Sequence, residues 1–134
     1  MEKRDSETSL KGRILLMDDD PLISTVAAKM IMSLGHQVVT VPGGEELLKT
    51  YTEAKEQGAA FDLLILDLTI PQGMGGAETL AKVRAFDPGV KALVSSGHTH
   101  DPVVEGFQKY GFIGVINKPY RLEELKQAIR EALS

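Results

Sequence analysis

The chain has 134 residues, a formal net charge of −4, an apolar fraction of 43% and a charged fraction of 25%. These values suit one folded domain, and no unbroken apolar stretch approaches the roughly 20 residues that a membrane-spanning helix needs. The absence of cysteine excludes a disulfide framework and a thiol nucleophile, and it suits a reducing compartment, for which the cytoplasm is the default. Because Lys and Arg form no cluster, nucleic acid is not expected as a direct partner.

The chain begins with a polar segment, residues 1–11, that carries no apolar period. We expect it to be a leader or linker, with the folded domain over residues 12–134. An apolar strand is predicted over residues 13–17. Asp20 and Pro21 then suit the first positions of a helix, which ends at Gly35.

The middle of the chain repeats this alternation of short apolar runs with longer amphipathic stretches. A strand is predicted over residues 37–41, and the helix after it lies between Gly44 and Gly58. The run Leu63–Leu66 is apolar without alternation, which is typical of a central parallel strand buried on both faces. This strand ends in Asp67.

The last part of the chain supplies two more units of the same kind. A glycine-rich loop over residues 71–76 leads into a helix. The remaining elements are predicted as a strand over 90–95, a short helix from about 101, a strand over 112–116 and a final helix from 122 to 133.

Five strands alternating with helices predict an α/β fold, a (βα)5 doubly wound parallel five-stranded sheet with helices on both faces. In such sheets the functional site lies at the carboxyl ends of the strands. Acidic residues follow the first strand, Asp67 ends the third, Ser96 follows the fourth, and Lys118 follows the fifth. We therefore expect these residues to meet at one edge of the sheet.

The run Asp18-Asp19-Asp20 is the feature that most needs an explanation. Adjacent carboxylates repel one another, so a bound cation is the simplest compensation, and a hard divalent metal is the leading candidate. Taken alone, the run would also be explained by capping of the following helix. Asp20, directly before Pro21, is better interpreted as that cap.

With Asp18-Asp19, Asp67, Ser96 and Lys118-Pro119 in this order, the chain resembles a receiver domain of a two-component response regulator. The resemblance implies a flavodoxin-like fold with strand order 2-1-3-4-5. It also implies phosphoacceptor signalling rather than metabolic catalysis. A phosphohistidine donor, either a histidine kinase or a histidine phosphotransfer domain, would pass its phosphoryl group to the chain.

The resemblance assigns a role to each of these residues. Asp67 would be the phosphoacceptor. Mg²⁺, for which Mn²⁺ could substitute, would be bound by Asp19, Asp67 and the backbone carbonyl of Thr69, with Asp18 mainly outside the direct ligands. Lys118 would pair with a phosphoryl oxygen, after a cis peptide bond to Pro119, and Ser96 would donate its hydroxyl. Ser96 fits the family pattern better than Ser95 because Gly97 follows it.

Other positions bear on how such a domain would switch. The family often has an aromatic residue three positions before the lysine, and here Val115 stands there, so an aromatic rotamer switch cannot operate at that position. Thr69 and His98 would flank the phosphoryl group. The switched surface would lie over the fourth helix, the fifth strand and the fifth helix, facing an output domain or partner protein. The loop over 71–76 favours a receiver from a hybrid histidine kinase, and a free-standing regulator is the alternative.

Three other functions use related architectures or residues. A haloacid-dehalogenase-type aspartyl-phosphate hydrolase also uses a strand-end Asp, a Lys and Mg²⁺, but it expects an Asp where Thr69 stands. A flavodoxin-like cofactor binder would need a phosphate-binding loop where Asp18 to Asp20 lie. A phosphorylation-independent interaction module is the third alternative, and the intact acidic set argues against it.

Overall fold

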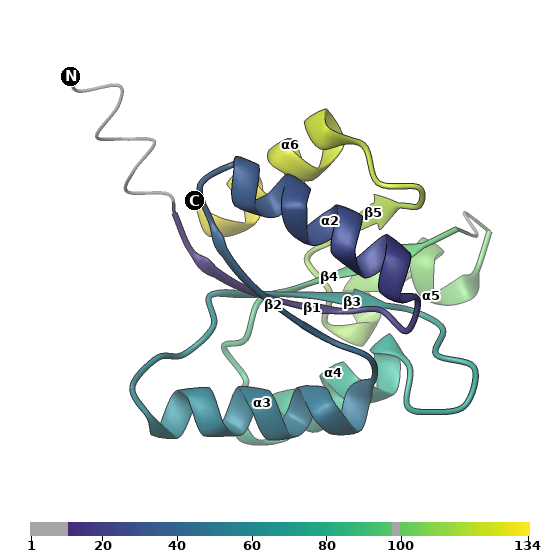
Figure 1. Cartoon of the computed structure of the whole chain (residues 1–134). Coiled ribbons are helices and arrows are strands. Elements are labelled where there is room, and N and C mark those ends of the chain that lie inside the picture. Colours follow the sequence, from purple (N-terminus) through teal and green to yellow (C-terminus); the bar gives the residue numbers. More distant parts are fainter. Residues whose placement is uncertain (1–10, 98–99) are drawn as a thin grey trace.

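The computed structural model describes residues 11–97 and 100–134. Five parallel strands form one sheet in the order β2-β1-β3-β4-β5, which confirms the predicted doubly wound topology (Figure 1). The strands are β1 (Arg13–Met17), β2 (Gln37–Val41), β3 (Leu63–Asp67), β4 (Ala92–Ser96) and β5 (Gly114–Asn117).

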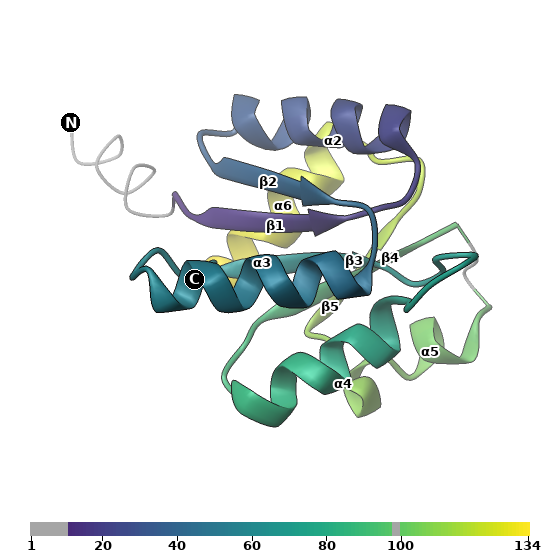
Figure 2. The ribbon, with the colours of Figure 1, turned by 60° about the horizontal axis from the view of Figure 1, so that its bottom comes forward.

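The helices lie on both faces of this sheet, as Figures 1 and 2 show. They are α2 (Pro21–Ser33), α3 (Gly44–Glu56), α4 (Gly76–Phe86), α5 (Pro102–Glu105), the 3-10 helix η1 (Phe107–Tyr110) and α6 (Leu122–Leu133). Helices α2 and α6 cover one face, and α3, α4 and the α5–η1 segment cover the other. Within the described part of the chain, no helix has both the length and the apolar character that crossing a membrane requires.

The sheet buries a separate apolar cluster on each face because successive strand residues point to opposite sides. In β1, Leu15 packs with the α3–α4 cluster and Leu16 with the α2–α6 cluster. Every residue of β3 is buried. Since full burial of a Leu or Ile side chain stabilises a fold by roughly 1.5–3 kcal/mol, this rigid centre holds the strand ends in place.

Strands β4 and β5 begin two residues later than the sequence predicted, and each ends one residue later. Before β4, the Val90 N–H donates to the Asp87 carbonyl at 3.2 Å and so closes a turn. Before β5, the Phe112 N–H donates to the Phe107 carbonyl at 3.1 Å and extends the turn of η1. Val90 at the end of the first turn, and Phe112 and Ile113 at the end of the second, are apolar, which is why the pattern alone placed the strand starts too early.

Candidate functional site

Two buried carboxylates lie side by side at the carboxyl edge of the sheet. Asp18 directly follows β1 and is 3% exposed, and Asp67 ends the neighbouring strand β3 and is 4% exposed. Asp19 is exposed. Carboxylate oxygens of all three residues lie within 4.8 Å of one another, so the structure brings together the acidic cluster that the sequence predicted.

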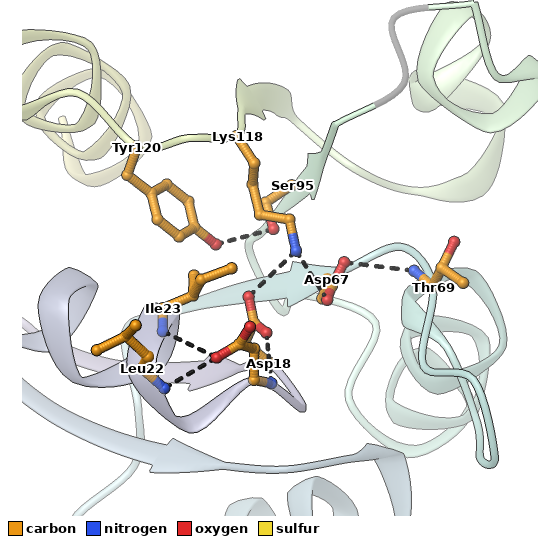
Figure 3. A network of polar contacts seen from close by, with 9 residues as sticks. Asp18, Leu22, Ile23, Asp67, Thr69, Ser95, Lys118 and Tyr120 are labelled. Carbon is orange, nitrogen blue, oxygen red and sulfur yellow. Dashed lines mark hydrogen bonds and ion pairs between the residues drawn. The ribbon is translucent and has the colours of Figure 1, made fainter.

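Lys118 reaches this cluster from the loop after β5. Its Nζ atom lies 3.1 Å from Asp67 Oδ2 and 3.3 Å from Asp18 Oδ2, so one ammonium group bridges the two buried carboxylates (Figure 3). The peptide bond between Lys118 and Pro119 is cis, as the family resemblance implied. A buried charge is tolerated where it is paired in this way.

The electrostatics of the site are unbalanced toward negative charge. Burial raises the pKa of Asp67, the bonded Lys118 lowers it, and the charge of Asp18 raises it again, with a net upward shift. Burial by itself would lower the pKa of Lys118, but the hydrogen bonds and charges of Asp67 and Asp18 raise it overall. Lys118 is therefore cationic at neutral pH, and its one ammonium group pairs with the two buried carboxylates while Asp19 lies beside them as a third acidic residue.

The three consecutive aspartates differ in their surroundings. Asp18 Oδ1 accepts a hydrogen bond from the Asp20 N–H at 2.9 Å, and Asp18 Oδ2 contacts Lys118, so both oxygens of Asp18 are engaged. Asp20 Oδ1 accepts from the backbone N–H groups of Leu22 and Ile23 at 2.9 and 3.2 Å, which confirms its role as the cap of α2. Asp19 presents its carboxylate to solvent at the edge of the cluster.

The two serines that end β4 are both buried but have different neighbours. Ser96 is the last residue of the strand and is 5% exposed, at the same sheet edge as Asp67. Ser95 is opposite Asp67 in the parallel register, and its Oγ accepts a hydrogen bond from the Tyr120 hydroxyl at 2.9 Å. The sequence reasoning missed Tyr120. The signal available in the sequence was a pair of hydroxyl-bearing residues: Ser95 in an apolar strand and Tyr120 just after Lys118-Pro119.

The loop after β3 also contributes to the site. The Thr69 backbone N–H lies 3.4 Å from Asp67 Oδ1, and the Thr69 residue is exposed. Further along, Gly75 is required for packing because a Cβ atom there would overlap the Leu68 carbonyl oxygen. His98, the other residue expected to flank the phosphoryl group, lies outside the described residues.

A groove of about 510 Å³ opens beside Asp19. Its walls are the start of α3, including Glu45 and Glu46, and the loop from Ile70 to Met74. The groove gives a ligand space on the exposed side of the acidic cluster. Within β5, Val115 is half-buried against the α3–α4 cluster.

Comparison with known proteins assigns the chain to a family. The response regulator receiver domain model matches residues 14–130, so the chain belongs to that family. It is therefore a signalling phosphoacceptor domain of the two-component type and not a conventional enzyme, which decides against the haloacid-dehalogenase alternative.

One relative and two solved structures illustrate the similarity. A response regulator receiver protein of Anaeromyxobacter is 32% identical over 80% of this chain, which spans only 42% of that relative's length. A complex of CheX and CheY with BeF3 and magnesium from Borrelia burgdorferi has a TM-score of 0.82 at 22% identity, covering 91% of this chain and 89% of that one. The receiver domain of a sensor histidine kinase from Pseudomonas aeruginosa, with a magnesium ion in its active site cleft, has a TM-score of 0.76 at 23% identity, covering 92% and 98%.

Proposed function

We propose that this receiver domain accepts a phosphoryl group from a phosphohistidine donor onto Asp67, with Mg²⁺ bound at the acidic cluster. The observation that carries the proposal is the convergence of three carboxylates within 4.8 Å with the Lys118 ammonium 3.1 Å from Asp67. A phosphoryl group in transfer needs cations close to its oxygens and a nucleophile in line with the bond that breaks. The Lys118 ammonium would be one such cation, bound Mg²⁺ would be another, and Asp67 would be the nucleophile.

The donor set fits Mg²⁺. Mg²⁺ prefers hard oxygen ligands, typically one or two carboxylates together with water and phosphate oxygens. Asp19 and Asp67 are the proposed direct ligands, together with the Thr69 carbonyl, and Asp18 orients the cluster through its bonds to the Asp20 N–H and Lys118. Bound there, the ion would neutralise charge on the transferring phosphoryl group. Mn²⁺, which also takes oxygen ligands, would substitute.

The chain's own residues carry out the transfer. An Asp67 carboxylate oxygen attacks phosphorus to form an acyl phosphate. The bond from phosphorus to the donor imidazole nitrogen breaks, and its electron pair stays on that nitrogen. Lys118 pairs with a phosphoryl oxygen, and Ser96 donates its hydroxyl to another, which draws the end of β4 toward the site. These movements would bias the surface formed by α5, η1, β5 and α6 toward a state read by a partner.

Several finer expectations belong to this proposal. The donor would be a histidine kinase or a histidine phosphotransfer domain, and the domain would work in the cytoplasm. Residues 12–134 would form the receiver and residues 1–11 a leader or linker. Origin in a hybrid histidine kinase stays a prediction alongside the free-standing regulator.

The proposal is tested by intact mass measurement after incubation with Mg²⁺ and acetyl phosphate. The wild-type protein should gain the mass of one phosphoryl group, and Asp67→Asn should gain none. Asp62→Asn is the matched control: Asp62 lies just before β3 at the opposite edge of the sheet, where it accepts a hydrogen bond from the Arg13 N–H at 2.8 Å. The Asp62→Asn variant should gain the mass of one phosphoryl group, as the wild type does. Labelling that persists in Asp67→Asn would refute the assignment.

A further inference from the structure

We propose that Ser95 and Tyr120 are positioning residues that hold Lys118 at the phosphoacceptor through the hydrogen bond between their side chains. The inference rests on the proposed function, because it concerns the residue expected to stabilise the transferring group. Neither side chain forms a hydrogen bond with the carboxylates of Asp18 or Asp67. Their role would be exerted through the loop that carries Lys118.

The first supporting observation is where the hydrogen bond lies. The Tyr120 hydroxyl donates to Ser95 Oγ at 2.9 Å, and Ser95 and Tyr120 are 0% and 9% exposed (Figure 3). If this hydrogen bond broke, the buried hydroxyl groups would have no water to bond with instead. Breaking it is therefore energetically costly.

The second observation is what the bond connects. Ser95 is the register partner of Asp67, and its carbonyl accepts from the Leu68 N–H at 2.9 Å, so Ser95 is fixed to the strand end that carries the acceptor. Tyr120 is two residues after Lys118. The hydrogen bond therefore ties the Lys118 loop directly to the acceptor's neighbouring strand.

The third observation is that Lys118 is anchored on both sides. Its own backbone N–H donates to the Ser96 carbonyl at 3.0 Å. With the Tyr120 side chain bonded to Ser95, the loop is attached to two successive residues of β4. Because Lys is a long, flexible side chain, fixing its backbone reduces the volume its ammonium explores and keeps it within reach of Asp67.

The consequence is a kinetic role for two hydroxyl groups outside direct contact with phosphate. Removing either one should loosen the loop and lower the rate of phosphoryl transfer by roughly threefold to tenfold, because misplacing a charge-stabilising group lowers transition-state stabilisation. Mg²⁺ affinity should change by less than about twofold, since the proposed metal ligands are untouched.

The test measures initial phosphorylation rates by acetyl phosphate and Mg²⁺ in a double-mutant cycle. Thr and Val at position 95 have the same branched shape and differ in the hydroxyl group, so comparing the two variants isolates the hydroxyl from most of the packing change. With Tyr120 present, the Thr variant should react roughly threefold to tenfold faster than the Val variant. In a Tyr120→Phe background the two should react equally, and Tyr120→Phe alone should be slower than the wild type by about the factor that separates Ser95→Val from Ser95→Thr.

Tyr51→Phe is the matched control, because it also removes a tyrosine hydroxyl with a side-chain partner, Asp87 Oδ2 at 2.6 Å, but away from the acidic cluster. Its melting temperature should fall and its rate should stay at the wild-type value. Equal rates for the Ser95→Thr and Ser95→Val variants, or an unchanged rate in Tyr120→Phe, would overturn the inference. A wild-type protein that is not labelled, or label that persists in Asp67→Asn, would instead contradict the proposed function.

Discussion

At the scale of single residues, the site contains more acidic side chains than basic ones. Asp18 and Asp67 are buried and share one ammonium, while Asp19 adds a third negative charge at the exposed edge. Like charges placed this close destabilise the folded state unless a cation joins them. The folded domain therefore gives up stability at a place where a metal ion can restore it.

This balance predicts how the domain responds to Mg²⁺. Millimolar Mg²⁺ should raise the melting temperature, with a stabilisation of roughly 1.4 kcal/mol when its concentration is ten times Kd. Asp19→Asn should be slightly more stable than the wild type without metal, because one repulsive charge is gone, and should respond weakly to Mg²⁺. Differential scanning fluorimetry with and without Mg²⁺ measures both effects.

Asp20→Asn is the control for that experiment. Asn caps helices as well as Asp does, and Asp20 bonds the start of α2 rather than joining the cluster, so most of the Mg²⁺ response should remain. An equal loss of response in the Asp19→Asn and Asp20→Asn variants would show that bulk charge, and not direct ligation by Asp19, attracts the ion.

At the scale of elements, the loop between β3 and α4 is shaped by one glycine more than by the others near it. A Cβ atom at Gly75 would overlap the Leu68 carbonyl oxygen, whereas at Gly73 the nearest atom, a methyl of Ile70, lies at 3.4 Å. Gly75→Ala should therefore destabilise the domain by roughly 1–3 kcal/mol, and Gly73→Ala by much less. Chemical denaturation of both variants measures the difference, and equal destabilisation would contradict the packing argument.

A second element-scale prediction concerns the end of α4, which is linked to α3 by side chains. Asp87 accepts from the Tyr51 hydroxyl at 2.6 Å and pairs with Lys55 at 2.8 Å. The hydrogen bonds from Lys55 and Tyr51 lower the pKa of Asp87 below its ordinary value. The stabilisation from this contact is present above the carboxyl's unfolded pKa and is lost as pH falls through the lower folded pKa.

Asp87→Asn should therefore lower the stability at pH 7 by roughly 1–2 kcal/mol. The gap to the wild type should shrink as pH falls from about 5 to below the folded pKa. Melting temperatures of both proteins across this range test the prediction. A gap that is the same at pH 7 and at low pH would show that the contact acts through packing rather than through the carboxylate's charge.

At the scale of the whole molecule, much of the architecture follows from the sequence. Alternating apolar runs and amphipathic stretches predict five strand–helix units, and parallel strands put Asp18, Asp67, Ser96 and Lys118 at one edge, where the structure has them. The order of the strands followed from the family resemblance. The predicted strand starts at Val90 and Phe112 were wrong because these two apolar residues belong to the turns that precede β4 and β5.

The parts that could not be predicted depend on side chains that meet across the fold. Ser95 and Tyr120 are 25 residues apart, and Tyr51 and Asp87 are 36 apart. A periodic pattern identifies which face of an element is buried, but it does not select which polar groups on that face become partners. Which polar groups pair depends on how both apolar clusters pack. Here the Tyr120–Ser95 hydrogen bond connects the end of β4 to the loop after β5 that carries Lys118.

Phosphorylation of Asp67 is tested most directly by locating the phosphoryl group on the chain. The protein is incubated with Mg²⁺ and acetyl phosphate, the acyl phosphate is reduced with borohydride, which converts the acceptor aspartate to homoserine, and the digested peptides are sequenced by mass spectrometry. We expect homoserine at position 67, formed only when Mg²⁺ is present. Homoserine at another aspartate, or none at position 67 in protein that has gained a phosphoryl group, would contradict this expectation.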